Sequence, residues 1–333
     1  MVQISVIGAG AWGTALAQIQ SQAGRDVTLW ARETSVVESI KEHGENKVYL
    51  PGIQLSETLE ITDSLSRAVE HADILLLVTP AQYLRGSLES MRDVAAEGKP
   101  MVICSKGIEI ETGKMLSQVM EEVLPEATCA VLTGPTFARE IAQGLPSAVT
   151  IATHDRDVAS ELSENLACRT LRPYITDDLL GAQIGGAVKN VLAIACGVIS
   201  GRKMGESARA ALMTRGMVEM GRLASALGAN KETLTGMCGM GDLVLTCSSM
   251  QSRNFSLGVM LGEGRTLDDI MGERKSVTEG VHTAKALMKM AKQNAIDMPI
   301  CESVFQYLAE NADLDETISQ MLNRPFAHQY SKS

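Results

Sequence analysis

The stretch Gly8-Ala9-Gly10-Ala11-Trp12-Gly13 decides the fold of the first half of this chain. It follows the apolar run Val2–Ile7, opens the helical segment Thr14–Ser21, and precedes a second β-branched run at Val27. In a dinucleotide-binding turn, the first glycine permits the bend, the second admits the pyrophosphate and the third packs helix against strand. Glycine spacing alone also occurs in structural turns, but the complete strand, turn, helix and strand order predicts a Rossmann unit that binds a nicotinamide dinucleotide.

Short aliphatic runs alternate with helical segments up to about residue 175, which is the pattern of a mostly parallel α/β sheet. The run Ile74–Val78 is apolar throughout, so we expect a strand that is covered on both faces. The predicted strands are Val2–Ile7, Val27–Trp30, Leu59–Thr62, Ile74–Val78, Met101–Ser105, Thr128–Leu132 and Ala148–Ala152.

From Asp177 onward, the composition changes to long helix patterns, beginning with Leu179–Ile199 and Glu206–Leu227. A chain of 333 residues also exceeds what one hydrophobic core usually serves. We therefore predict a dinucleotide-binding domain over residues 1–176 and an all-α domain over residues 177–333.

The second domain carries signals for where its helices begin and end. Asp177 or Asp178 is a predicted N-cap of the first long helix, and Gly228 and Gly262 stand where helix C-terminal glycines are expected.

The charge and composition limit the partners and the compartment. A net charge of −10 disfavours nucleic acid as the main partner, because phosphate backbones are bound by basic surfaces. Seven cysteines without a CxxC pair indicate reduced thiols, and the N-terminus resembles neither a signal peptide nor a membrane span. The five histidines are scattered, without an HExxH pattern, so no metal is implied. We expect a cytoplasmic protein without membrane insertion.

The end of the second predicted strand bears on the choice of cofactor. An acidic residue at this position holds the ribose 2′-hydroxyl of NAD, whereas this chain has Arg32, which suits the 2′-phosphate of NADP. Glu33 follows directly and is either that acidic residue shifted by one position or part of the next helix's first turn. NADP is therefore favoured, and NAD is not excluded.

Polar residues follow two later strands, at the edge of the sheet where ligands of open α/β folds bind. Lys106 comes after the strand that ends near Ser105, and the segment Thr133–Ala138 follows the next strand. Lys106 is either a site residue or an ordinary solvated lysine, and the pair Gly134-Pro135 by itself is equally compatible with a plain turn.

Lys189 and Asn190 lie within an otherwise apolar helix of small residues. Burial and a second nearby cation both favour the neutral amine, which would bring Lys189 toward the working range for proton transfer. A lysine whose amine reaches out of a core helix is the alternative.

A third motif favours the catalytic interpretation of Lys189. The run Gly241–Cys247 leads to Ser252-Arg253-Asn254, in which the serine can cap a helix while the arginine and free backbone N–H groups face an anion. A capped helix start is often purely structural. Together with Lys106 and Lys189, however, it predicts a cationic pocket in an acidic protein.

In their order and spacing, these segments resemble bacterial NAD(P)-dependent glycerol-3-phosphate dehydrogenases along the whole chain. The resemblance implies reversible hydride transfer between NADPH or NADH and C2 of dihydroxyacetone phosphate, giving sn-glycerol 3-phosphate for phospholipid synthesis. It also implies a helical domain of the 6-phosphogluconate-dehydrogenase C-terminal type and a homodimer. The resembling segments are Gly8–Ala17, Ser105–Glu109, Leu132–Ala138, Lys189-Asn190, Gly241–Cys247, Ser252–Asn254 and Glu279–Val281.

The resemblance further implies roles for individual residues. Lys189 would be the acid and base at the C2 oxygen, with Lys106, Asn190, Asp242 and Thr246 orienting or polarising the substrate. The remaining substrate contacts would come from Gly134, Thr136, Ser252, Arg253 and Asn254. Cofactor contacts would come from Gly8, Gly10, Ala11, Trp12, Gly13, Arg32, Tyr49, Lys106, Ala138, Arg253, Val277 and Glu279. Ala11 replaces a residue that is often polar in the family, so one side-chain contact to the pyrophosphate is expected to be missing.

The sequence argues against two other classes of protein. β-Hydroxyacid and 6-phosphogluconate dehydrogenases place their asparagine one helical turn after the catalytic lysine, whereas here Asn190 is adjacent and position 193 is alanine. A non-catalytic NADP-binding sensor would have no need of Lys106, Lys189, Asp242 and Arg253.

Overall fold

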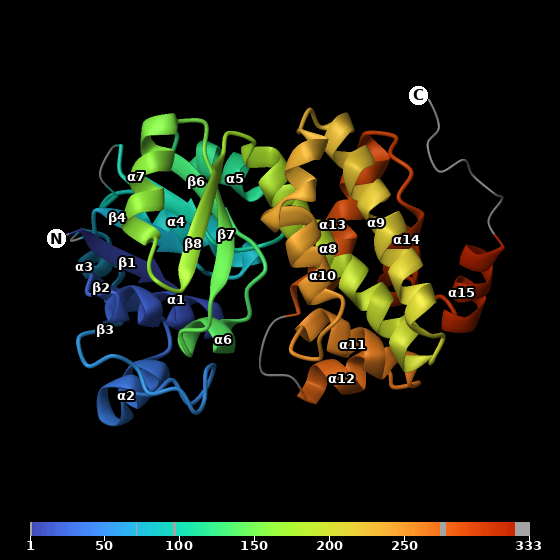
Figure 1. The fold of residues 1–333 in the computed structure, drawn as a ribbon, viewed down its shortest axis with the longest axis horizontal. Helices are drawn as coiled ribbons and strands as arrows, with labels where there is room; N and C mark the ends of the chain where they lie inside the picture. The colour runs from blue at the N-terminus through green and yellow to red at the C-terminus, as the bar shows by residue number, and fades with distance from the viewer. Residues whose placement is uncertain (1, 71, 96–97, 274–277, 324–333) are drawn as a thin grey trace.

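The computed structural model describes residues 2–70, 72–95, 98–273 and 278–323. Figure 1 shows two bodies side by side, a twisted sheet flanked by helices and a cluster of helices. The last strand ends at Thr176 and the first long helix begins at Leu179, so the predicted domain boundary falls in the turn between them. The exact division of the chain stays a prediction.

The sheet has eight strands in the order β3-β2-β1-β4-β5-β6-β7-β8. All neighbouring pairs are parallel except β6 and β7, which are antiparallel. A mostly parallel sheet was predicted, and this is confirmed. The strands are β1 Gln3–Ile7, β2 Asp26–Trp30, β3 Glu60–Thr62, β4 Ile74–Leu77, β5 Pro100–Ile103, β6 Thr128–Thr133, β7 Ser147–Ala152 and β8 Leu171–Thr176.

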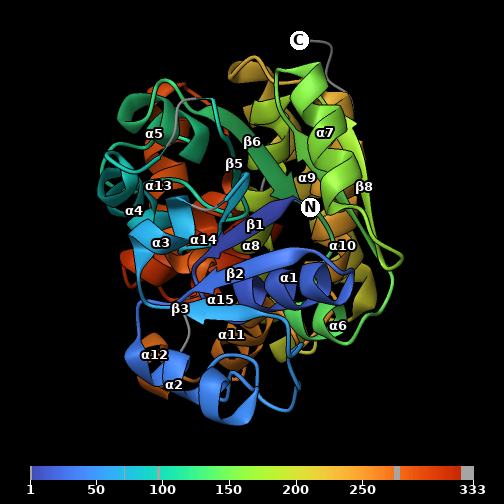
Figure 2. The same cartoon turned by 90° about the vertical axis from the view of Figure 1, so that its left-hand side faces the viewer.

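Helices cover both faces of the sheet, as the all-apolar strand β4 requires. One apolar core joins the sheet to α1, α2, α6 and α7, and a second joins the other face to α3, α4 and α5 (Figure 2). Every residue of β4 is fully buried between these two layers. These helices are α1 Ala11–Gln22, α2 Thr34–His43, α3 Leu65–Glu70, α4 Leu84–Met91, α5 Leu116–Val123, α6 Ala138–Ala142 and α7 Arg156–Leu166, with the 3₁₀ turn η1 Ala81–Tyr83 before α4.

All seven predicted strands are present, with ends that differ by one or two residues. The eighth strand, β8, was not predicted. Its sequence contains Pro173, and most of its side chains are half-buried or exposed, so it lacks the apolar alternation of a central strand. It forms an edge of the sheet, where proline is tolerated.

The described part of the second half is helical and is organised around α8, Leu179–Gly201. This helix is long and apolar enough to cross a membrane, but 78% of its most apolar stretch is buried inside the structure, as expected for a core helix. The other helices are α9 Glu206–Ala226, α10 Asp242–Thr246, α11 Arg253–Gly262, α12 Leu267–Glu273, α13 Glu279–Gln293, α14 Pro299–Ala309 and α15 Leu314–Leu322, with short turns η2 Lys231–Thr235 and η3 Met237–Gly241 before α10.

Glycines allow α8 and α11 to pack closely against each other. A Cβ atom added to Gly197 would lie 2.2 Å from the Phe255 carbonyl oxygen, and one added to Gly258 would lie 2.0 Å from that of Ile194. This contact fixes the start of α11 against α8.

The predicted helix ends were partly correct. Asp178 is the N-cap of α8, and Gly228 follows α9 with φ +80°, as a C-terminal glycine should. The prediction for Gly262 was wrong, because this residue is the last in α11 and packs against Gly201. Gly264, with φ +96°, lies just beyond it instead. All seven cysteines are free thiols, as predicted.

Candidate active site

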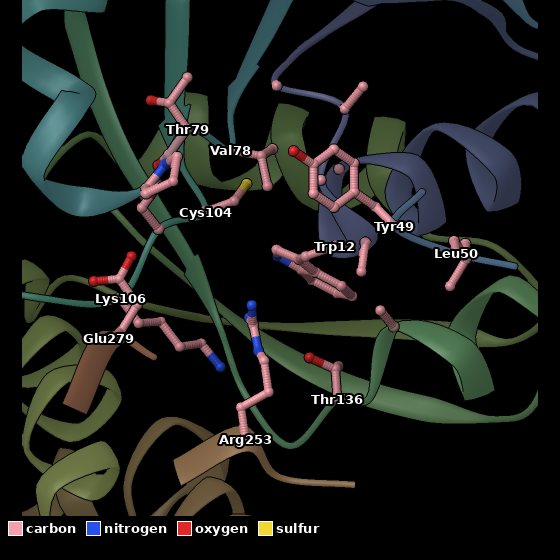
Figure 3. Close-up of a pocket in the computed structure, with 18 of the residues that line it drawn as sticks. Trp12, Tyr49, Leu50, Val78, Thr79, Cys104, Lys106, Thr136, Arg253 and Glu279 are labelled. Atoms are coloured by element: carbon pink, nitrogen blue, oxygen red, sulfur yellow. The ribbon is translucent and has the colours of Figure 1, made fainter. Parts of the chain in front are cut away.

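A cavity of about 710 Å³ opens at the carboxyl edge of the sheet, between the sheet and the helical half. Its walls include the glycine turn at β1, the ends of β2, β4 and β5, and residues of α8 and α11. The volume lies within the range of small-molecule and cofactor sites. In Figure 3, Arg253 extends from the helical half into this cavity toward the indole ring of Trp12.

The glycine turn forms a cradle that fits a pyrophosphate. A Cβ on Gly13 would lie 1.8 Å from the Gly8 carbonyl oxygen, so only glycine lets α1 approach β1 this closely. A Cβ on Gly10 would meet nothing within 4 Å, so this position borders open space in the cavity wall. The N-cap of α1 makes no side-chain cap bond, which leaves first-turn N–H groups available to an anion.

Trp12 and Tyr49 lie on the same wall as the turn (Figure 3). The indole N–H of Trp12 is buried and has no hydrogen-bond partner in the described protein, so it needs a partner from outside. Buried Asn46 holds this wall together by donating to the Ala9 carbonyl oxygen at 2.9 Å and accepting from the backbone N–H of Tyr49 at 3.1 Å. The unpartnered donor and the open cradle fit a dinucleotide.

Arg32 lies at the outer end of the cavity, just beyond β2. Its guanidinium is 3.3 Å from the Glu33 carboxylate and 5.9 Å from the ring centroid of Tyr83. Glu33 is the N-cap residue of α2, which agrees with the predicted alternative that placed it at the start of the next helix. The Arg32 side chain is 71% exposed and can therefore reorient toward a ligand, whereas the Glu33 side chain is half-buried.

Two lysines and one aspartate meet at the inner end of the cavity. Asp242 is fully buried, and its two carboxylate oxygens accept from the Lys189 and Lys106 amines, each at 2.5 Å. Lys189 also donates to the Thr246 hydroxyl at 2.7 Å, and Lys106 donates to the Gly134 carbonyl oxygen at 3.0 Å. One carboxylate therefore holds both amines in place, one from the sheet half and one from α8.

The environment of Lys189 makes its amine a competent acid and base near neutral pH. Burial lowers the pKa of Lys189 from 10.5 to about 8, and the positive charge of Lys106 acts in the same direction, whereas Asp242 opposes both. This direction was predicted from the apolar helix and a second nearby cation. A lysine that reaches out to solvent is excluded, because Lys189 is only 6% exposed.

The start of α11 faces the same space. Ser252 caps the helix by accepting from the Phe255 N–H at 3.2 Å, as predicted. Asn254 donates to the Asn190 side-chain oxygen and accepts from the Gly280 N–H, both at 2.9 Å. The two asparagines thus link α8, α11 and α13 where Arg253 enters the cavity.

Glu279, at the first position of α13, joins the two halves across the cavity. One carboxylate oxygen accepts from the Ala81 N–H at 3.2 Å, and the other is buried without a hydrogen-bond partner in the described protein. Burial raises the pKa of Glu279, while the charge of Arg253 opposes this. The unpartnered oxygen is a place where a ligand's N–H group would fit.

The structure brings most of the predicted site residues to this one cavity, and the exceptions are few. Gly134 and Asp242 do not line the cavity. Instead, Gly134 accepts a hydrogen bond from Lys106, and Asp242 accepts hydrogen bonds from both lysines. Val277 lies outside the described residues. The predicted residues that line it are Gly8, Gly10, Ala11, Trp12, Gly13, Arg32, Tyr49, Lys106, Thr136, Ala138, Lys189, Asn190, Thr246, Ser252, Arg253, Asn254 and Glu279.

Four residues that were not predicted also line the cavity, namely Thr79, Pro80, Tyr83 and Ser87. They follow β4, the strand next to β1, so they occupy the edge where ligands of such sheets bind. The same position after a strand predicted the residues that follow β5 and β6, and it could have indicated those that follow β4.

Comparison with known proteins identifies the family. The model for the NAD-dependent glycerol-3-phosphate dehydrogenase N-terminus matches residues 3–159, and the model for the C-terminus of the same family matches residues 178–319.

Individual relatives agree with these matches. The chain is 52% identical over 324 residues to a glycerol-3-phosphate dehydrogenase (NAD(P)+) from Parvibaculum lavamentivorans, covering 97% of both chains. It is 54% identical over 322 residues to the Rhodospirillum rubrum protein of the same name, covering 97% of this chain and 92% of the relative. The crystal structure of glycerol-3-phosphate dehydrogenase from Coxiella burnetii superimposes with a TM-score of 0.93 at 36% identity, over 97% of this chain and 99% of that one. The chain therefore belongs to the NAD-dependent glycerol-3-phosphate dehydrogenase family.

Proposed function

We propose that this protein reversibly reduces dihydroxyacetone phosphate to sn-glycerol 3-phosphate with NADPH or NADH, supplying glycerophospholipid synthesis. The observation that carries the proposal is the Asp242 carboxylate, which holds the amines of Lys106 and Lys189 at 2.5 Å each beside a dinucleotide cradle. A cationic centre of this kind suits a ketone whose oxygen becomes negative as it is reduced. The family membership and its relatives' names support the same reaction.

Lys189 is the proposed acid and base. With a pKa of about 8, its amine is mostly protonated at neutral pH and can give a proton to the C2 oxygen. In the reverse direction, the neutral amine takes the proton from the C2 hydroxyl. Asp242 and Thr246 fix the direction of its N–H bonds through contacts at 2.5 and 2.7 Å.

Lys106 is the second proposed cation at the reacting oxygen. Because its amine shares Asp242 with Lys189, the two amines are held on the same side of the cavity floor. Asn190 lines the cavity one residue from Lys189, and its side chain is oriented by Asn254. We assign Lys106 and Asn190 to polarising and orienting the ketone.

The substrate phosphate is proposed to bind at the start of α11. Arg253 offers a guanidinium that suits phosphate geometry, and Ser252 and Asn254 flank it at the capped helix end. Thr136 also lines the cavity, and the Gly134 carbonyl oxygen accepts a hydrogen bond from the Lys106 amine.

The cofactor is proposed to lie along the sheet edge. Its pyrophosphate would bind at Gly8, Gly10, Ala11 and Gly13, with Trp12, Tyr49 and Ala138 along the wall. Glu279 and Arg253 would approach its nicotinamide half together with Lys106, and Val277 is assigned to the cofactor by family likeness alone. When bound, the nicotinamide supplies or accepts the hydride at C2. Arg32 at the adenosine end supports a preference for NADPH.

We propose a homodimer, in line with the family, which sedimentation analysis would test. We propose a cytoplasmic protein because all seven cysteines are free thiols, which suits a reducing compartment.

The experiment measures oxidation of NADPH and NADH by the purified protein with dihydroxyacetone phosphate and with unphosphorylated dihydroxyacetone. The proposal expects fast turnover with the phosphorylated ketone, the more so with NADPH, and sn-glycerol 3-phosphate as product. Equal rates with both ketones, or no oxidation of either cofactor, would contradict it.

A further inference from the structure

A second hollow, of about 240 Å³, lies at the opposite end of the strands from the candidate active site. It is formed where β1, β2 and β3 begin, whereas the candidate active site lies beyond their carboxyl ends. The two spaces share no lining residue among those described, and the proposed reaction makes no use of the second. The polar residues that line the second hollow are Gln3, Ser5, Asp26, Thr28, Glu60 and Arg67.

The register of the strands brings these polar residues together. Gln3 pairs with Asp26, and Thr28 pairs with Ser5 on one side and with Glu60 on the other. Side chains alternate between the two faces of a strand, so paired residues and residues two positions apart lie on the same face. All five therefore stand on one face of the sheet.

The same face is apolar at its other end, where a helix covers it. Ile7 and Trp30 belong there to one apolar core with Ala68 and Val69 of α3. This helix spans only Leu65–Glu70, too short to reach along the whole length of the strands. The polar end of the face is therefore left open, with a single α3 side chain at its border.

The Ser5 side chain points to an occupant of this hollow. Ser5 is only 2% exposed, and its hydroxyl makes no hydrogen bond to any residue that the structure describes. The half-buried Thr28 hydroxyl beside it likewise has no partner in the described part of the chain. A buried hydroxyl costs free energy unless something supplies its hydrogen bond.

The charges at the hollow favour a cation. Asp26 accepts from the Gln3 side-chain amide at 3.2 Å, and Glu60 accepts from Arg67 at 3.3 Å. Each carboxylate uses one oxygen in these bonds, and the described residues donate nothing to the other oxygen. Two carboxylates against one guanidinium leave a net negative charge.

The donor set suits an organic cation better than a metal ion. No group of three acidic, histidine or cysteine side chains that could hold a metal occurs in the described part of the chain. A protonated primary amine instead donates three hydrogen bonds. One carboxylate oxygen and the hydroxyls of Ser5 and Thr28 are three acceptors that match it.

The spacing of the two carboxylates indicates a ligand with two such groups. Glu60 lies opposite Thr28, which is two positions beyond Asp26 on β2. With a rise of about 3.3 Å per residue and about 4.8 Å between strands, the Cα atoms of Asp26 and Glu60 are about 8 Å apart. A short aliphatic chain with an amine at each end can contact both carboxylates.

We propose that this hollow is a binding site for a short aliphatic diamine. One ammonium group binds the free oxygen of Asp26, the other binds that of Glu60, and the hydroxyls of Ser5 and Thr28 accept from them in between. The inference does not depend on the proposed reaction, because the two spaces are lined by different residues.

The test is calorimetric titration of the full chain with diaminobutane, and butylamine and butanediol are the matched probes. The diamine is expected to bind, butylamine should bind about tenfold more weakly because it carries one charge, and butanediol should not bind. Asp26→Asn, Glu60→Gln and Ser5→Ala should each weaken the diamine by about fivefold or more. Glu164→Gln, which removes an exposed carboxylate on α7, should leave its affinity unchanged.

Ser5→Ala keeps the inference testable if a charge variant folds poorly, because alanine suits a buried position and removes only the hydroxyl. Unchanged affinity in Ser5→Ala and in a folded carboxylate variant would overturn the inference, since the diamine would then be attracted only by the net charge of −10. A wild-type protein that gives no binding heat with diaminobutane would also overturn it. So would equal binding of diaminobutane and butanediol, because the hollow would then not select a cation.

Discussion

The most informative perturbation of the site is to remove the charge of Asp242, because this carboxylate sets the protonation of Lys189. The pKa of Lys189 falls from 10.5 to about 8, which corresponds to about 3 kcal/mol in favour of the neutral amine. Asp242 opposes that fall, and its oxygen lies 2.5 Å from the lysine amine. In Asp242→Asn, the pKa of Lys189 should therefore fall further, by about one to three pH units.

This change has a measurable size. At pH 7.5, a pKa of about 8 leaves about three quarters of Lys189 protonated, and a fall of about two pH units leaves about one thirtieth, a loss of about twentyfold. The assay is kcat for reduction of dihydroxyacetone phosphate as a function of pH. The variant should lose activity at neutral pH and should recover part of it at acid pH. The descending limb of the curve of kcat against pH, where Lys189 loses its proton, should move to lower pH.

Lys106→Gln provides the opposite perturbation. The positive charge of Lys106 lowers the pKa of Lys189, so its removal should move the same limb to higher pH. Asp313→Asn, which changes an exposed helix cap far from the site, should leave the limb in place. If the Asp242 and Lys106 variants moved the limb in the same direction, or left it unmoved, Lys189 would not be the titrating acid.

Three further predictions follow from other parts of the structure. Arg253→Ala should raise KM for dihydroxyacetone phosphate far more than for dihydroxyacetone, since a charge-assisted contact is worth about 2 kcal/mol; equal effects on both ketones would refute the phosphate assignment. Gly10→Ala should fold with an unchanged Tm, because the added Cβ would have no protein atom within 4 Å. The variant should lose NADPH affinity in a fluorescence titration, because the Cβ enters the space proposed for the pyrophosphate. Unchanged affinity would count against the glycine turn as the pyrophosphate site. Burial raises the pKa of Glu219 from 4.5 to about 7, so its stabilising contribution is complete below pH 4.5 and is lost as the pH rises to about 7, a difference of about 3 kcal/mol. Glu219→Gln should therefore gain stability relative to the wild type across this range in urea unfolding, and a constant difference between the two proteins would show that Glu219 does not titrate there.

Local sequence signals predicted much of the fold because the relevant forces are local. The turn at Gly8–Gly13 and the seven apolar runs each follow from the conformational needs of nearby residues, and the structure contains all of them. The edge strand β8 was not predicted, because its half-exposed side chains make no apolar pattern. Gly262 was misassigned because its packing partner Gly201 comes from another helix, which spacing within one segment does not reveal.

In the candidate site too, features set by nearby residues were predicted, and features set by contacts between distant segments were not. Lys106 and Lys189 were predicted because a cation after a strand or inside an apolar helix is unusual, and Arg253 was predicted because it follows a serine that can cap a helix. Asp242, the common partner of Lys106 and Lys189, gained its role from the family resemblance, since positions 106 and 242 meet only in the folded chain. Buried Asn46 and exposed Tyr83 gave no signal, because their roles depend on surfaces that the sequence does not order in space.

Lys189 is the proposed proton donor of this dehydrogenase, and the proposed cofactor site lies on the other wall of the cavity. The decisive measurement compares wild type and Lys189→Ala for single-turnover reduction of dihydroxyacetone phosphate and for NADPH binding in the same preparation. We predict that turnover is abolished while NADPH binds nearly as in the wild type. A substantial residual single-turnover rate in Lys189→Ala would contradict the assignment of Lys189 as the proton donor.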